Sequence, residues 1–139
     1  MRKQKNYPVI RSGNTFLVPA AVGGKSPGDA LKVNLLVDTG ASFTILPVEV
    51  VKKLGYDTSH PVRMARLAAA SGIIVAPIIK ISWLNSLGWV MKNFELAVHT
   101  IPSPAFDGVL GMDFLHRCKA IISIADAEIY FRETKAGKV

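Results

Sequence analysis

The chain has 139 residues, of which 50% are hydrophobic and 19% are charged, and its formal net charge is +7. This length predicts a single domain, and the apolar content is high enough to fill a core, which argues against a disordered chain. Apart from one cluster at residues 2–5 the basic residues are scattered, so we expect a solvated surface and no nucleic-acid partner.

The first half of the chain predicts strands and one short helix. Apolar runs flank a turn rich in glycine and proline, as in a hairpin, and Pro47 and Gly55 are placed to begin and end a helix. The expected elements are a basic, flexible arm at 1–14, strands at 15–22, 30–38 and 42–47, and the helix at 47–55.

The second half predicts further strands joined by turns. Ser71 and Gly72 mark the tip of a long hairpin, and an Asn-Ser-Leu-Gly turn leads into the next strand. The expected elements are strands at 62–69, 72–84 and 89–101, a loop at 102–108, a short strand and a helical turn within 109–117, and a hairpin at 120–132. The resulting prediction is a mostly-β domain at 15–132, a closed antiparallel barrel with one or two short helices, followed by a polar tail at 133–139.

Several other classes of protein lack support in the sequence. No apolar run reaches the roughly 18 residues that a membrane helix needs, and no signal peptide is recognisable, so we expect a cytoplasmic protein without a membrane partner. His60, His99 and His116 do not have metal-ligand spacing, and Cys118 is the only cysteine. We therefore expect no metal and no other cofactor.

The stretch Leu-Leu-Val-Asp-Thr-Gly-Ala-Ser at residues 35–42 contains the main candidate for chemistry. Asp-Thr-Gly alone is a weak motif, because aspartate and glycine are common in turns. Asp38, however, has apolar runs on both sides, and an unpaired buried carboxylate costs several kcal/mol or takes up a proton. Such a carboxylate indicates a functional site.

This stretch and the later Phe-Asp-Gly-Val-Leu-Gly-Met-Asp-Phe-Leu at residues 106–115 together resemble the single-domain, retroviral-type (retropepsin-like) aspartic proteases. The resemblance extends from about residue 16 to residue 131. It implies the retropepsin-like acid protease barrel, with one lobe per chain, and an active site in which two aspartates activate one water. Because the chain has one Asp-Thr-Gly, the resemblance implies a homodimer with Asp38 of each copy at the site.

The same resemblance assigns roles to three further groups of residues. Thr39 is expected to hydrogen-bond across the dimer axis, and Gly40 and Ala41 to support the catalytic loop. Val109, Leu110 and Gly111 are expected to pack beneath that loop, and the flap that closes over substrate is expected at Ala69, Ala70, Ser71 and Gly72. The chain lacks the acid and the arginine that brace many retroviral dimers, since it has Ser42, Phe43 and Met112 in those regions.

The sequence thus predicts a homodimeric aspartic endopeptidase that cleaves peptides or proteins, with a preference for hydrophobic residues at the cleavage site. The alternative from a different class is a catalytically weak or inactive dimeric module of the same fold that binds a peptide or protein. A basic nucleic-acid-binding protein is a third and more distant hypothesis.

Overall fold

The computed structural model describes residues 6–69 and 72–132, and 54% of these residues are in strands and 8% in helices. The predicted mostly-β class is therefore confirmed. Within these residues the elements are β1 (Asn6–Pro8), β2 (Ile10–Ser12), β3 (Thr15–Gly23), β4 (Ala30–Val37), β5 (Ile45–Leu46), α1 (Val48–Lys53), β6 (Arg63–Ala69), β7 (Gly72–Ser86), β8 (Trp89–Val98), β9 (Gly108–Leu110), α2 (Met112–Leu115), β10 (Ala120–Ser123) and β11 (Glu128–Phe131).

Six of these strands close a barrel. The hydrogen-bonded order is β3, β4, β9, β5, β8 and β7, and β7 pairs again with β3. Four of the six ladders are antiparallel, whereas β4–β9 and β5–β8 are parallel. The predicted closed, mostly antiparallel barrel is therefore correct. The parallel ladders join segments far apart in the chain, which local patterns do not reveal.

The core lies inside the barrel and under two short helices. The sequence predicted one or two such helices. Phe94 of β8 and Phe114 of α2 are almost fully buried and meet edge to face, with ring centroids 6.0 Å apart. Helix α1 follows Pro47, ends just before Gly55 and buries Val51 in this core. Its sequence-derived boundaries are therefore confirmed within a residue or two.

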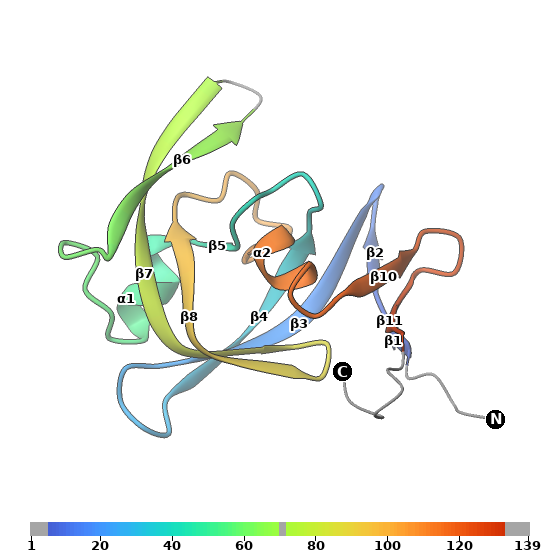
Figure 1. Ribbon diagram of the computed structural model, residues 1–139, viewed down its shortest axis with the longest axis horizontal. Helices are drawn as coiled ribbons and strands as arrows, with labels where there is room; N and C mark the ends of the chain where they lie inside the picture. The colour runs from blue at the N-terminus through green and yellow to red at the C-terminus, as the bar shows by residue number, and fades with distance from the viewer. Residues whose placement is uncertain (1–5, 70–71, 133–139) are drawn as a thin grey trace.

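The strand β7 has three partners along its length. Its first half pairs with β6 and its second half with β8, and its last residues also pair with β3; each pair is antiparallel. Figure 1 shows the β6–β7 hairpin in green, extending away from the barrel. The long hairpin that the sequence predicted is thus present, while Ala70 and Ser71, two of the four residues expected at its tip, lie outside the described residues.

The amino-terminal end differs from the arm expected at residues 1–14. Residues 6–8 pair with 128–130 of β11, and residues 10–12 pair with 15–17 of β3. Strands of three residues show no useful periodicity, so their structure depends on partners that the local sequence does not identify. With β10, strands β1 and β11 form a small sheet on the side of the molecule away from α1 (Figure 1).

The hairpin expected near the carboxyl end is confirmed, because β10 and β11 pair in register from Ala120–Phe131 to Ser123–Glu128.

The helices of the described residues are too short to cross a membrane, since the longer one has six residues.

Candidate active site

Asp38 lies at the end of a central strand of the barrel. It follows Val37, the last residue of β4, and its backbone N–H donates to the Leu110 carbonyl at 3.0 Å. The side chain is half-buried, and its Oδ1 accepts a hydrogen bond from the Gly40 backbone N–H at 2.9 Å. The carboxylate is therefore held by its own loop at a point that solvent still reaches.

The three residues expected beneath this loop lie next to it. Val109 and Leu110 are buried in β9 and pair with Leu36 and Val37 in a parallel ladder. Gly111 passes so close to the loop that a Cβ atom there would lie 2.7 Å from the carbonyl carbon and oxygen of Phe43. Since non-bonded carbon atoms prefer separations of about 3.5–4.0 Å, only glycine fits this crossing without a shift.

The loop residues after Asp38 face in different directions. Thr39 and Gly40 are exposed, whereas Ala41 is half-buried and its carbonyl accepts a hydrogen bond from the Met112 N–H at 2.8 Å. Thr39 lines two grooves. It is therefore accessible to another molecule, while Ala41 joins the loop to the start of α2.

The two grooves beside Thr39 differ in their walls. The first, which we call the Asp38 groove, measures about 490 Å³ and is lined by Arg11, Gly13, Asn14, Thr15, Phe16, Leu36, Val37, Asp38, Thr39, Ile122 and Ile124. The second, the Met112 groove, measures about 510 Å³ and is lined by Thr39, Met112, Leu115, His116, Lys119, Ala120, Ile121, Ile122 and Arg132. Asp38 is the single acidic residue among these lining residues.

Two other acidic residues, neither of which is followed by Thr-Gly, are placed away from Asp38. Asp107 accepts a hydrogen bond from the Asn34 N–H at 2.8 Å and lines a different pocket. Asp126 lies in the turn between β10 and β11 and accepts from the Ser123 hydroxyl at 3.1 Å. Neither carboxylate lines a groove with Asp38.

The β6–β7 hairpin packs one face toward the loop that follows Asp38. Leu67 of β6 and Ala76 of β7 belong to a small buried apolar cluster that also contains Ile78 and Ala97, and Phe43 and Ile74 pack against this cluster. Of the four residues expected at the tip, Ala69 ends β6 and Gly72 begins β7, while Ala70 and Ser71 are outside the described residues.

The sequence interpretation missed a polar pair beside the loop, formed by the buried Thr44 and the half-buried Asp113. Thr44 donates to Asp113 twice, from its N–H to Oδ2 at 2.8 Å and from its hydroxyl to Oδ1 at 2.7 Å. Burial raises the pKa of Asp113, although donors from Thr44 and Phe114 and the nearby Arg117 oppose this effect. A polar Thr44 inside the apolar run Phe-Thr-Ile-Leu was the available signal, because such a residue needs a partner.

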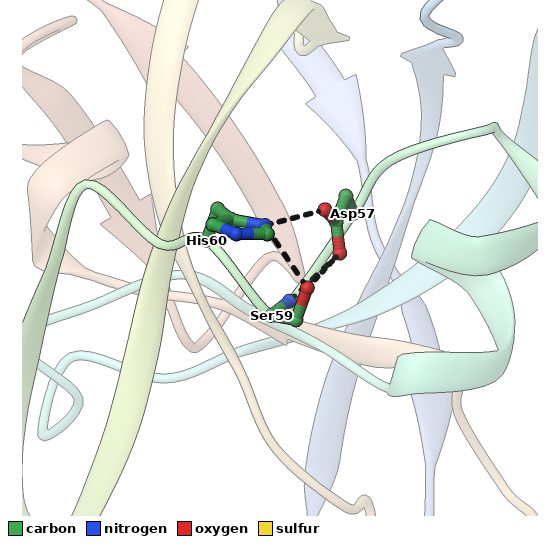
Figure 2. Close-up of polar contacts among 3 residues, drawn as sticks. All are labelled: Asp57, Ser59 and His60. Carbon is green, nitrogen blue, oxygen red and sulfur yellow. Dashed lines mark hydrogen bonds and ion pairs between the residues drawn. The ribbon is translucent and has the colours of Figure 1, made fainter.

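A second polar cluster contains the residue types of a serine-protease triad but not its arrangement (Figure 2). Ser59 donates to Asp57 Oδ1 at 2.6 Å, and one nitrogen of His60, Nδ1, contacts both Ser59 Oγ and Asp57 Oδ2. In a catalytic triad the two imidazole nitrogens face different partners. All three residues are exposed, so the cluster is a loop structure and not a nucleophilic site.

The described residues include histidine, cysteine, aspartate and glutamate side chains, which are the usual metal ligands. Among them, no group of three or more His, Cys, Asp or Glu side chains is arranged to hold a metal ion.

Comparison with known proteins gives two matches and one negative result. The family model described as aspartyl protease matches residues 18–114, a range that includes the Asp38 loop and Gly111. Among solved structures, the chain is similar to a retropepsin-like aspartic protease from Rickettsia conorii, with 26% sequence identity and a TM-score of 0.68. That match covers 94% of this chain and 96% of the other. No curated protein sequence matches.

Proposed function

The chain belongs to the aspartyl protease family, whose model matches residues 18–114, and from this premise we propose that it is a homodimeric endopeptidase with Asp38 of each copy at one shared active site. The retropepsin-like fold supports a protease in general. The observation that carries the finer proposal is the position of Asp38, half-buried at the end of β4 in a groove that contains no second acid.

The proposed chemistry needs two carboxylates around one water. Like charges this close share a proton, so one carboxylate is ionised and the other is protonated. The ionised group takes a proton from the water as it attacks the scissile carbonyl, and the protonated group donates to the carbonyl oxygen. Since each chain supplies one such aspartate, a second copy must supply the other.

Two features near Asp38 support pairing of two copies at this face. Thr39 is exposed and lines both grooves, where it can reach the loop of a partner across a two-fold axis. Ile122 of β10 lines both grooves, and within residues 6–69 and 72–132 β10 pairs with β11 alone. Its other edge has no strand partner within these residues, and an unpaired strand edge is a template for a strand of another molecule.

The β6–β7 hairpin is proposed as the flap, because Leu67 and Ala76 belong to the apolar cluster against which Phe43, in the loop after Asp38, packs. Closure of such a hairpin would contribute backbone hydrogen bonds to a substrate and exclude water. Leu67, Ile74 and Phe43 make this side apolar, which supports a preference for hydrophobic residues at the cleavage site.

The proposal is tested by cleavage of a mixed peptide library between about pH 3 and pH 8, at several protein concentrations. We compare the wild type with Asp38→Asn, which removes the ionisable carboxylate, and with Asp29→Asn, an exposed turn residue outside both grooves. Wild type and Asp29→Asn are expected to cleave, with rates that rise more steeply than linearly at low concentration, while Asp38→Asn binds peptide without turnover.

Equal turnover by Asp38→Asn and the wild type would contradict the proposed role of Asp38. If the wild type forms a dimer and binds peptides but never cleaves them, the result supports the dimeric binding module instead of the protease.

A further inference from the structure

The loop that carries Asp38 is attached to the segment crossing beneath it by a compact set of hydrogen bonds. Five of them join residues 38–44 to residues 110–113, and three of the five involve Thr44. They are Asp38 N–H to Leu110 O (3.0 Å), Met112 N–H to Ala41 O (2.8 Å), Gly111 N–H to Thr44 Oγ1 (3.2 Å), Thr44 N–H to Asp113 Oδ2 (2.8 Å) and Thr44 Oγ1 to Asp113 Oδ1 (2.7 Å).

Thr44 and Asp113 are the two side chains in this set. Thr44 has 0% of its surface exposed, and its hydroxyl both accepts from Gly111 and donates to Asp113. Asp113 also accepts from the Phe114 N–H at 2.8 Å, so it receives three hydrogen bonds in all. The described structure contains no buried side-chain nitrogen or oxygen without a partner, so this pair is fully satisfied.

We propose that Asp113 is a positioning residue that acts through Thr44 to hold the Asp38 loop in the geometry needed for catalysis. This inference rests on the proposed catalytic role of Asp38. Productive active-site groups must be held to within about 0.5 Å, and buried hydrogen bonds to fixed backbone donors supply such restraint. Asp113 touches neither the Asp38 groove nor the Met112 groove as a lining residue, so its effect passes through the loop.

The geometry requires a carboxylate and not merely a polar side chain. The Thr44 N–H faces Oδ2 of Asp113, and the Phe114 N–H faces Oδ1. Asparagine has one acceptor oxygen in place of two, so in either orientation Asp113→Asn turns an NH₂ group toward one of these two N–H donors. In one orientation the Thr44 N–H loses its acceptor, and in the other the Phe114 N–H keeps only its longer bond to the Gly111 carbonyl at 3.2 Å. A donor that loses its acceptor is destabilising, so either change should loosen the loop at Thr44 or the start of α2.

Two readouts on the full chain test the proposal. Hydrogen–deuterium exchange reports the protection of residues 38–44 without any need for activity, and steady-state kinetics on a cleaved peptide separates kcat from KM. Asp113→Asn should raise exchange in 38–44 and 110–114 by about tenfold or more, with β7 and β8 unchanged. It should also lower kcat by about 10- to 100-fold with little change in KM, because loop displacements near 1 Å have effects of this size.

Three further variants make the test specific. Thr44→Ser keeps the hydroxyl and should behave nearly as wild type, whereas Thr44→Val has a similar shape, loses the hydroxyl and should behave like Asp113→Asn. Asp57→Asn is the matched control, because Asp57 also accepts hydrogen bonds from a backbone N–H and a hydroxyl, but in the exposed loop of Figure 2. It should leave kcat and the exchange of residues 38–44 unchanged. If Asp113→Asn fails to fold, Thr44→Val provides the same comparison.

Wild-type kcat and unchanged loop exchange in both Asp113→Asn and Thr44→Val would overturn the proposal. It would also be overturned if exchange rose equally in all strands, since Asp113 would then support global stability alone. A wild-type protein without peptidase activity would contradict the proposed function, and loop exchange in the variants would still decide whether Asp113 holds the loop.

Discussion

Replacement of Gly111 by alanine should damage activity far more than stability. The added Cβ would lie 2.7 Å from the carbonyl carbon and oxygen of Phe43 and 2.8 Å from the Ala41 oxygen. All three atoms are backbone atoms of the Asp38 loop, so relief to a normal contact of about 3.5–4.0 Å requires a shift near 1 Å. Overpacking of this kind typically costs about 1–3 kcal/mol, whereas a displacement of this size at a catalytic group can reduce the rate about 100-fold.

The assay compares kcat/KM and Tm for wild type, Gly111→Ala and Gly28→Ala. Gly28 has a φ of +88° but open space around its Cβ position, and it lies in the turn between β3 and β4. Gly28→Ala should therefore lose about 1–2 kcal/mol of stability from backbone strain and keep its activity. The reasoning is refuted if Gly111→Ala retains wild-type kcat/KM, or if both variants lose activity only in proportion to their loss of folded protein.

Two further predictions concern groups whose pKa is shifted. Hydrogen bonds from Ser59, and to a lesser extent from His60, lower the pKa of Asp57 below its ordinary value of 3.8. The ionised Asp57 therefore contributes to the stability of the folded protein above pH 3.8, and this contribution is lost as the pH falls toward the lowered pKa. The stability difference between wild type and Asp57→Asn, measured by urea unfolding, should therefore shrink below about pH 4, and a difference that is constant with pH would contradict this. Burial raises the pKa of Cys118 to about 11, so iodoacetamide should modify it slowly in the native protein and rapidly in urea, and equal rates in both would show that the thiol is accessible.

Much of the fold follows from local sequence patterns. The β3–β4, β6–β7 and β10–β11 hairpins and helix α1 were predicted because apolar runs and turn residues alternate along the chain. The three-residue strands β1 and β2 were missed because their stability comes from pairing with β11 and β3 rather than from their own periodicity. The register of the parallel ladders likewise depends on contacts between distant segments.

The candidate site likewise contains residues that local sequence patterns reveal and residues that only distant contacts bring together. Asp38 and Gly111 were predicted as site residues because each belongs to a short motif with an unusual apolar context. The pair of Thr44 and Asp113 was missed because it joins residues 69 positions apart, and nothing in either local sequence names the partner. Only the crossing of the segment 110–113 beneath the Asp38 loop brings the hydroxyl and the carboxylate together.

The central claim, that two copies of Asp38 form one active site, is tested most directly by mixing wild type with Asp38→Asn. At a fixed total concentration at which the protein is dimeric, the two forms are exchanged to equilibrium and peptidase activity is measured against the mole fraction of wild type. If each site needs Asp38 from both copies, activity falls as the square of the wild-type mole fraction, because mixed dimers are inactive. Activity that falls linearly with that fraction would show that each chain works alone and would contradict the shared site.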